Sequence, residues 1–248
     1  MISKNQIKYV RQLEQKKFRK AENLFIAEGH KVVGDLLAAG FIPTQLFATA
    51  DWQSPVGSVE VTQVTPDELA RLNLQQHPQQ VLALFPIPEA QPQISNLKSQ
   101  ISILLDNVQD PGNLGTIIRI ADWFGIDTIF CSPGTVDAWN PKVVQATMGS
   151  IARVHIIYIE PDELFDSLPQ DYPIYGTFLD GDNIYTQQLS SHGLIVMGNE
   201  GNGISDAVRA RVSHKLLIPD FHHGDTADSL NVAIATAITC SEFRRRGL

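Results

Sequence analysis

Residues 194–205 read Leu194-Ile195-Val196-Met197-Gly198-Asn199-Glu200-Gly201-Asn202-Gly203-Ile204-Ser205. Four apolar residues run directly into a segment with three glycines, which hold one carboxylate and two amides between them. A short apolar run of this kind is typical of a strand buried on both faces of a parallel sheet. Glycine lets the backbone turn sharply, and ligands in open α/β sheets lie beyond the carboxyl ends of the strands. The stretch therefore predicts a strand followed either by a ligand-binding loop or by an ordinary glycine-rich turn.

Apolar runs and helical patterns alternate on both sides of this stretch. Strands are expected at 101–106, 128–131, 152–158, 173–179, 194–197 and 215–218. Helices are expected at 114–124, 141–148, 161–167, 205–212 and 229–245. Regular alternation of this kind predicts an α/β fold, with a mainly parallel sheet and helices on both of its faces.

The N-terminal part of the chain forms a separate pattern of shorter elements. Ser3 is a suitable N-cap for a first helix, and further short strands and helices follow up to a strand at 81–85. Four of the 14 prolines then fall within residues 78–92. Because proline-rich segments are typical of domain boundaries, we expect a small α/β domain at 1–88, a linker at 89–99 and a second domain at 100–248.

Composition limits the class of protein. The chain has 248 residues, of which 43% are hydrophobic and 19% are charged, as in an ordinary globular protein. Its two cysteines, Cys131 and Cys240, form no CxxC pair, which argues against a disulfide scaffold or a zinc site and fits a reducing compartment. No apolar leader or bilayer-spanning segment is present. The sequence therefore predicts a soluble cytoplasmic protein.

Charge is spread unevenly along the chain. The net charge is −8, yet residues 1–31 carry eight Lys or Arg against three Asp or Glu, whereas the other residues carry 11 against 24. The basic cluster Lys16, Lys17, Arg19 and Lys20 is expected to be exposed. It could contact the phosphates of a nucleic acid, or it could be the solvated face of a helix.

Two further segments carry polar residues at the ends of expected elements. Asn113 is a suitable N-cap, and Arg119 falls opposite the apolar stripe of the helix that follows. Near the C-terminus, Ser229 is expected to cap the last helix, with Asn231 in its first turn. That helix is apolar nearly all round, which suggests packing against a second subunit.

The glycine stretch itself does not match the common nucleotide-binding patterns. Its spacing is GxxGxG instead of GxGxxG, and GxxxxGK[ST] occurs nowhere in the chain. The sequence is still compatible with a nucleotide-like ligand held by backbone groups. Glu200 would then act as a hydrogen-bond acceptor or as a base. His222 and His223 have a metal-like composition, but adjacent histidines point apart in most conformations, so no metal site is expected.

Together these segments resemble a known family. Asn113-x-Gly115-x-x-x-Arg119, the stretch 198–204 and Ser229-Leu230-Asn231-Val232 are similar to the three ordered motifs of the SpoU (TrmH-type) family, in the SPOUT class of S-adenosylmethionine-dependent RNA 2′-O-ribose methyltransferases. The resemblance extends over roughly residues 101–246. Upstream, Arg19 and residues 25–29 resemble the start of the small substrate-binding domain that many members carry.

The resemblance implies a C-terminal trefoil knot, a homodimer and a set of site residues. The cofactor S-adenosylmethionine would contact the backbone at Gly198, Ile218 and Leu230. The catalytic set would be Asn113, Arg119, Glu200, Ser229 and Asn231. The loop at 220–228 is longer than the family pattern, and its role is left open.

These residue types suit methyl transfer to a ribose hydroxyl. The acceptor oxygen must lie in line with the methyl carbon, so positioning contributes much of the rate. In such enzymes Arg119 would act on the hydroxyl, although a guanidinium stays protonated in nearly all proteins. We therefore expect Arg119 to hold the target phosphate and stabilise the developing alkoxide as well, with Asn113 and Glu200 orienting Arg119 or the RNA.

The expected function is a homodimeric RNA 2′-O-methyltransferase, with ribosomal RNA favoured over transfer RNA because the separate N-terminal domain resembles that of ribosomal-RNA members. One alternative is a non-catalytic RNA-binding protein of the same fold, which the joint presence of Asn113, Arg119, Glu200 and Asn231 disfavours. Another alternative is a nucleotide-dependent oxidoreductase. The phosphate-binding pattern expected of such an enzyme is missing from this sequence.

Overall fold

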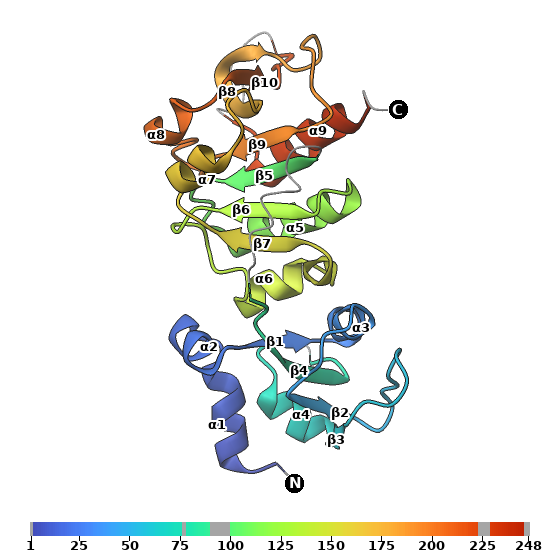
Figure 1. The fold of residues 1–248 in the computed structure, drawn as a ribbon. Coiled ribbons are helices and arrows are strands. Elements are labelled where there is room, and N and C mark those ends of the chain that lie inside the picture. The colour runs from blue at the N-terminus through green and yellow to red at the C-terminus, as the bar shows by residue number, and fades with distance from the viewer. Residues whose placement is uncertain (1, 76–77, 90–99, 223–228, 246–248) are drawn as a thin grey trace. The chain divides into compact units, whose positions relative to one another are not determined.

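The structure is a computed structural model that describes residues 2–75, 78–89, 100–222 and 229–245 (Figure 1). It divides into two compact units, residues 1–89 with 137–153 and residues 90–136 with 154–248. Nearly all of the linker expected at 89–99 lies outside the described residues. The domain boundaries expected from the sequence therefore stay a prediction, and each unit is described by itself.

The larger unit is built on one parallel sheet. Its described strands lie in the order β10-β8-β9-β5-β6-β7, and every neighbouring pair is parallel (Figure 1). The strands are β5 (Ile101–Leu105), β6 (Thr128–Cys131), β7 (His155–Tyr158), β8 (Ile174–Asn183), β9 (Gly193–Met197) and β10 (His214–Leu217). All five residues of β5 and of β9 are buried, as their mainly apolar sequences predict for central strands of a parallel sheet.

Helices cover both faces of this sheet. They are α5 (Pro111–Trp123), α7 (Pro161–Ser167), α8 (Asp206–Arg209) and α9 (Val232–Arg245). Successive strand residues point to opposite faces. Leu104 and Val196 pack in one core with residues of α7 and α8. On the other face, Tyr175 lies in register with Ile195, and its ring contacts Phe243 of α9 at a centroid distance of 4.8 Å.

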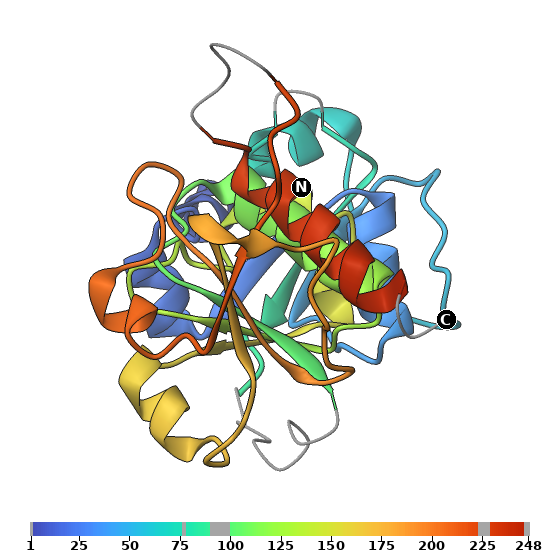
Figure 2. The same cartoon turned by 90° about the horizontal axis from the view of Figure 1, so that it is seen from above.

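Helices α5 and α9 lie side by side (Figure 2). The expected α/β class, with a mainly parallel sheet and helices on both faces, is therefore confirmed for this unit. The trefoil knot stays a prediction.

The smaller unit has a mixed sheet in the order β1-β4-β2-β3. Its strands are β1 (Leu24–Glu28), β2 (Gln45–Ala48), β3 (Thr62–Gln63) and β4 (Val81–Pro86). Its N-terminal helices are α1 (Lys4–Gln12), α2 (Lys16–Glu22), α3 (His30–Ala38) and α4 (Pro66–Leu72). Ser3 caps α1 as predicted, through a capping box with Gln6. The small α/β unit expected at the N-terminus is therefore present.

The segment 137–153 follows β6 in the chain but packs in the smaller unit. It contains α6 (Pro141–Ala146) and the 3₁₀ helix η2 (Ser150–Ala152). The Trp139 ring contacts the Phe25 ring of β1 at a centroid distance of 4.6 Å, and Arg153 Nη1 lies 3.2 Å from Asp35 Oδ2. Residues that are distant in sequence therefore complete the N-terminal unit.

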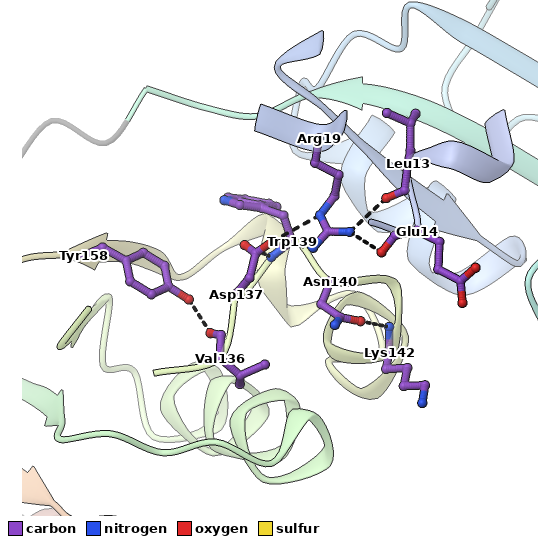
Figure 3. A network of polar contacts seen from close by, with 9 residues as sticks. All are labelled: Leu13, Glu14, Arg19, Val136, Asp137, Trp139, Asn140, Lys142 and Tyr158. Atoms are coloured by element: carbon purple, nitrogen blue, oxygen red, sulfur yellow. Dashed lines mark hydrogen bonds and ion pairs between the residues drawn. The ribbon is translucent and has the colours of Figure 1, made fainter. Parts of the chain in front are cut away.

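Arg19 shows how this segment is held (Figure 3). Its Nη2 lies 2.5 Å from Asp137 Oδ2, and its Nη1 donates to the carbonyls of Leu13 and Glu14 at 2.8 and 2.6 Å. The Arg19 side chain is only 2% exposed. The expectation that Arg19 is exposed for contact with RNA is therefore wrong, because a buried guanidinium with these partners has a structural role.

The lysines of the same basic cluster behave as expected. Lys16, Lys17 and Lys20 are exposed on α2, and Lys17 Nζ lies 4.8 Å from the centroid of the Phe18 ring. A surface contact with phosphates is open to these three side chains.

None of the described helices combines the length and the apolar character that crossing a membrane requires.

Replacing Arg19 should lower the stability of the smaller unit. Arg19→Ala leaves the Asp137 carboxylate, whose side chain is 14% exposed, without its cation, and breaking a buried pair in this way costs about 3–5 kcal/mol. We expect the free energy of unfolding in urea to fall by that amount. The exposed Lys20→Ala is the matched control and should stay within about 0.5 kcal/mol of wild type. A loss below about 1 kcal/mol for Arg19→Ala would contradict the structural role.

Candidate active site

A cavity of about 620 Å³ lies where the carboxyl ends of β8, β9 and β10 meet the start of α9. This volume falls within the range of small-molecule sites, roughly 300–1,000 Å³. Its described lining consists of Thr177, Phe178, Leu179, Asp180, Met197, Gly198, Asn199, Glu200, Gly201, Asn202, Gly203, Ile204, Arg209, Leu216, Leu217, Ile218, Ser229, Leu230, Val232 and Ala235. The glycine-rich stretch therefore lies on a cavity, as the ligand-loop interpretation predicts.

An irregular pairing of β8 with β10 shapes one wall of the cavity. Lys215 pairs with Gly176, but the next residue, Leu216, pairs with Asp182. Residues 177–181 therefore have no partner on β10 and leave the regular ladder. A Cβ on Gly181 would lie 2.6 Å from the Leu216 carbonyl carbon, so this approach of the two backbones requires glycine.

Another part of the lining is a tight turn after β9. The backbone amides of Asn199 and Gly203 each donate to the other residue's carbonyl at 2.9 Å. The Asn199 side chain holds the turn through Oδ1, which accepts from the amides of Gly201 and Asn202. Gly203 has φ +69°, and a Cβ on Gly198 would lie 2.2 Å from the Gly203 carbonyl carbon. Glycine is therefore required at both ends of the turn.

A chain of hydrogen bonds joins the three sequence motifs beside this turn. Asn113 Nδ2 of α5 donates to Glu200 Oε1 at 3.0 Å. Asn113 Oδ1 in turn accepts from Asn231 Nδ2 at 2.9 Å. Asn231 Oδ1 completes the chain by accepting from the amides of Ala233 and Ile234 at the start of α9. The structure thus brings together three of the five expected catalytic residues.

Glu200 is held as a carboxylate. Partial burial by itself would raise its pKa, but hydrogen bonds from Asn113 Nδ2 and from the amides of Asp110 and Gln109 outweigh burial and lower the pKa below its usual value. Because its oxygens already accept these donors, Glu200 acts as an anchor for the start of α5. This arrangement is poorly suited to a general base.

Two predicted helix caps are wrong. Asp110, and not Asn113, caps α5, because Pro111 begins the helix and Asp110 Oδ1 accepts from the Asn113 amide at 2.8 Å. At the last helix, Asn231 is the capping residue in place of Ser229, since α9 begins at Val232. At α5 the cap leaves the Asn113 side chain available for the hydrogen-bond chain, whereas at α9 the cap Asn231 is itself a member of that chain.

The other predicted residues fall into two groups. Gly198, Ile218 and Leu230, the residues expected to contact the cofactor, line the cavity, and so does Ser229, which was expected in the catalytic set. Arg119 does not belong to the described lining, and its side chain is exposed on α5. Six residues beyond Asn113, it lies about 9 Å further along the helix axis.

Two residues that hold the site were missed from the sequence. Asp106 is 2% exposed at the end of β5, and its Oδ2 accepts from the Ser205 amide at 2.7 Å. Asn199 Nδ2 donates to the Asn107 carbonyl at 2.7 Å. A carboxylate directly after a buried strand was a usable signal for Asp106, because strand ends meet at this edge. No local signal distinguished Asn199.

The described residues contain no group of three potential metal ligands. His222 donates its backbone amide to Asp220 Oδ1 at 2.8 Å, whereas residues 223–228, which hold His223 and most of the longer loop, lie outside the described part. The site is thus an apolar cavity with amide and carboxylate groups at its rim. Such a site binds a small organic ligand and orients a second reactant.

Comparison with known families agrees with this geometry. Residues 100–241 match the model of the SpoU rRNA Methylase family, and residues 4–83 match the MRM3-like substrate binding domain. Among curated proteins, the chain is 31% identical to the 23S rRNA (guanosine(2553)-2′-O)-methyltransferase RlmP of Bacillus subtilis, over 98% of this chain and 97% of the relative. It is also 31% identical to the mitochondrial rRNA methyltransferase 3 of Homo sapiens, over 72% of this chain and 46% of that protein.

Solved structures share the fold over the whole chain. A chain from Porphyromonas gingivalis assigned to the TrmH family of RNA methyltransferases is 41% identical and superposes with a TM-score of 0.89, covering 99% of both chains. An AdoMet-bound rRNA methyltransferase from Sinorhizobium meliloti is 29% identical with a TM-score of 0.88, covering 100% of this chain and 97% of that one.

The close packing at Gly198 predicts that an added methyl group lowers stability at this position but not at Gly201. Gly198→Ala places a Cβ 2.2 Å from the Gly203 carbonyl carbon and 2.3 Å from the Ile204 nitrogen, and overpacking of this kind costs about 1–3 kcal/mol. Gly201→Ala is the control, since the nearest atom to its Cβ is Asn199 Oδ1 at 3.7 Å. Thermal unfolding should show a lower Tm for Gly198→Ala alone. Equal shifts for both variants would contradict the packing argument.

Proposed function

The chain belongs to the SpoU rRNA methylase family, and from that premise we propose that it transfers a methyl group from S-adenosylmethionine to a ribose 2′-hydroxyl in RNA, with ribosomal RNA as the favoured substrate. The observation that carries this proposal is the hydrogen-bond chain Glu200–Asn113–Asn231. It gathers the three family motifs at the rim of one cavity of suitable size. The names of the full-length relatives support RNA 2′-O-methylation and favour ribosomal RNA over transfer RNA.

The residues present fit S-adenosylmethionine. Met197, Leu216, Ile218 and Val232 give the cavity an apolar lining for a nucleoside base, and a turn that excludes side chains at Gly198 leaves backbone groups close to the ligand. Gly198, Ile218 and Leu230 are the residues that would hold the cofactor. When bound, the cofactor supplies a methyl group activated by a sulfonium.

The polar rim would orient the reacting RNA. We propose that Asn113 and Asn231 present hydrogen-bonding groups to the substrate, while Glu200 fixes the start of α5 through the amides of Gln109 and Asp110. Holding the ribose oxygen in line with the methyl group contributes to the rate through positioning. Ser229, which lines the cavity, would contact the cofactor or the substrate from the α9 side.

Arg119 is proposed to bind the target phosphate and to stabilise the developing alkoxide while the hydroxyl proton passes to solvent; the O–C bond forms as the S–C bond breaks, and S-adenosylhomocysteine is released. A guanidinium keeps its charge at any physiological pH, so it acts by electrostatics and hydrogen bonds instead of accepting a proton. Within the described residues Arg119 has no polar partner in its own chain and does not line the cavity of that chain. Its five N–H donors are therefore open to the substrate.

A homodimer would explain the position of Arg119. Trp123 lies one turn beyond Arg119 on the same face of α5 and is 85% exposed, and Ile234 on the neighbouring α9 is 53% exposed. Large exposed apolar side chains on adjacent helices are typical of a protein interface. We propose that a second copy covers this surface, and that Arg119 of one chain serves the cavity of the other.

The smaller unit is proposed to bind RNA. It matches a substrate-binding domain model, and the exposed Lys16, Lys17 and Lys20 would contact phosphates without reading the sequence. We also place the protein in the cytoplasm, because Cys131 and Cys240 are free thiols, as is usual in a reducing compartment.

Arg119→Lys should reduce methyl transfer strongly. Lysine keeps the charge but loses the planar fork of donors, and removal of one transition-state donor costs about 10²–10³ in kcat. The measurement is transfer of a labelled methyl group from S-adenosylmethionine to ribosomal RNA, with the modified ribose located by resistance to alkaline hydrolysis. Arg211→Lys, whose side chain pairs with Asp166, is the control. Near-normal turnover of Arg119→Lys would refute the role, and labelling of transfer RNA alone would refute the substrate assignment.

Mixed dimers test whether Arg119 acts on the partner's cavity. One chain carries Arg119→Ala and the other carries Ala235→Phe, which fills the cavity that Ala235 lines. If the arginine crosses the interface, the mixed dimer keeps one complete site and regains activity that neither parent dimer has. An inactive mixed dimer would show that arginine and cavity belong to the same chain.

A further inference from the structure

At the cavity wall formed by β8, two cationic side chains contact one aromatic ring and share one carboxylate partner. Arg209 Nη2 lies 2.5 Å from Asp180 Oδ2, and Lys215 Nζ lies 3.7 Å from the same oxygen. The Arg209 guanidinium carbon lies 4.5 Å from the centroid of the Phe178 ring, and Lys215 Nζ lies 5.7 Å from it. Phe178, Asp180 and Arg209 line the cavity. None of the sequence motifs includes this cluster.

The cluster holds Arg209 in a defined position. Arg209 is the last residue of α8, which follows the glycine-rich turn, and its side chain is 35% exposed. Phe178 contacts the guanidinium as a cation–π partner, and Asp180 fixes the Nη2 end. A guanidinium has five N–H donors, so most of its donors stay available on the cavity side.

Arg209 also differs from the rest of the lining in charge. Among the described lining residues it is the one cation, and the two carboxylates are Asp180 and Glu200. Glu200 already accepts hydrogen bonds from α5. The Asp180 carboxylate is paired with both Arg209 and Lys215, so its negative charge is already matched. This wall therefore favours an anionic group on the ligand.

S-Adenosylmethionine carries one anionic group, the α-carboxylate of its methionine part. A carboxylate taken out of water requires a charged or multiple hydrogen-bonding partner, and arginine provides a planar fork that matches it. We propose that Arg209 binds the α-carboxylate of S-adenosylmethionine and that Asp180 is the positioning residue that aligns its guanidinium. This inference rests on the proposed function and assigns the end of the cavity that receives the amino-acid part.

The proposal predicts that Arg209 distinguishes ligands by their amino-acid part. S-Adenosylhomocysteine has the α-carboxylate, whereas 5′-methylthioadenosine keeps the adenosine and sulfur but lacks the amino-acid part. Arg209→Gln should weaken binding of S-adenosylhomocysteine by about 10- to 100-fold, as expected for loss of a hydrogen bond to a charged group. Its affinity for 5′-methylthioadenosine should stay within about twofold of wild type.

The experiment is isothermal titration calorimetry of the full chain with both ligands. Arg211→Gln is the matched control: it also removes an arginine that contacts an aromatic ring, Phe165, but Arg211 is outside the described lining of the cavity and should leave both affinities unchanged. Arg209→Lys keeps the charge and should recover part of the loss. Asp180→Asn should weaken S-adenosylhomocysteine binding less than Arg209→Gln does.

Several outcomes would overturn the inference. Unchanged affinity of Arg209→Gln for S-adenosylhomocysteine would exclude the contact. Equal loss for both ligands would show that Arg209 only maintains the shape of the cavity. Weaker binding of RNA with unchanged binding of S-adenosylhomocysteine would assign Arg209 to a phosphate of the substrate. Failure of the wild type to bind either ligand would contradict the proposed function itself, which separates that failure from the other three.

Discussion

The parallel sheet of the larger unit places the carboxyl ends of its strands at one edge, and the site depends on this constraint. Polar side chains that follow β5 and β9 meet there with the starts of α5 and α9. Asn113 joins them because its amide can donate to Glu200 and accept from Asn231 at the same time. A carboxylate could not donate and an ammonium could not accept, so an amide suits the middle position. The three motifs are thus linked by one neutral hydrogen bond between amides and one charge-assisted hydrogen bond to the Glu200 carboxylate.

The cavity arises because the ladder between β8 and β10 is interrupted. A regular β8 would continue its pairing with β10, whereas residues 177–181 leave the ladder and residues 177–180 line the cavity. Glycine is needed where the backbones approach most closely, at Gly181 and at Gly198. The same irregular segment carries Phe178 and Asp180, so the feature that opens the cavity also supplies its charged wall. Backbone irregularity and ligand recognition are therefore properties of one segment.

Arg19 and Arg119 show that burial gives two residues of the same type different roles. Both lie in helices, and both were expected to face RNA. Arg19 is enclosed by Asp137 and two backbone carbonyls and holds the segment 137–153 in the smaller unit. Arg119 is exposed and has no described polar partner in its own chain. The sequence around Arg19 could not distinguish these cases, because Asp137 is distant in the chain and lies in a connection between two strands of the other unit.

Local patterns in the sequence determined the element types, the parallel sheet and the three polar motifs. Strand residues and helix periodicity depend on neighbours within a few positions, so the mainly apolar runs at 101–106 and 194–197 were sufficient to predict β5 and β9. The tertiary structure alone decided which groups meet. Asp110 and Asn231 cap their helices in place of the predicted residues, Asn113 links Glu200 to Asn231, and Arg209 faces the cavity with Asp180. The links from Asn113 to Glu200 and Asn231, and from Arg209 to Asp180, join residues that are distant in the chain, so packing across the sheet sets their proximity and no local sequence signal encodes them. The two caps are contacts within three residues, and Pro111 directly after Asp110 was a usable local signal for one of them.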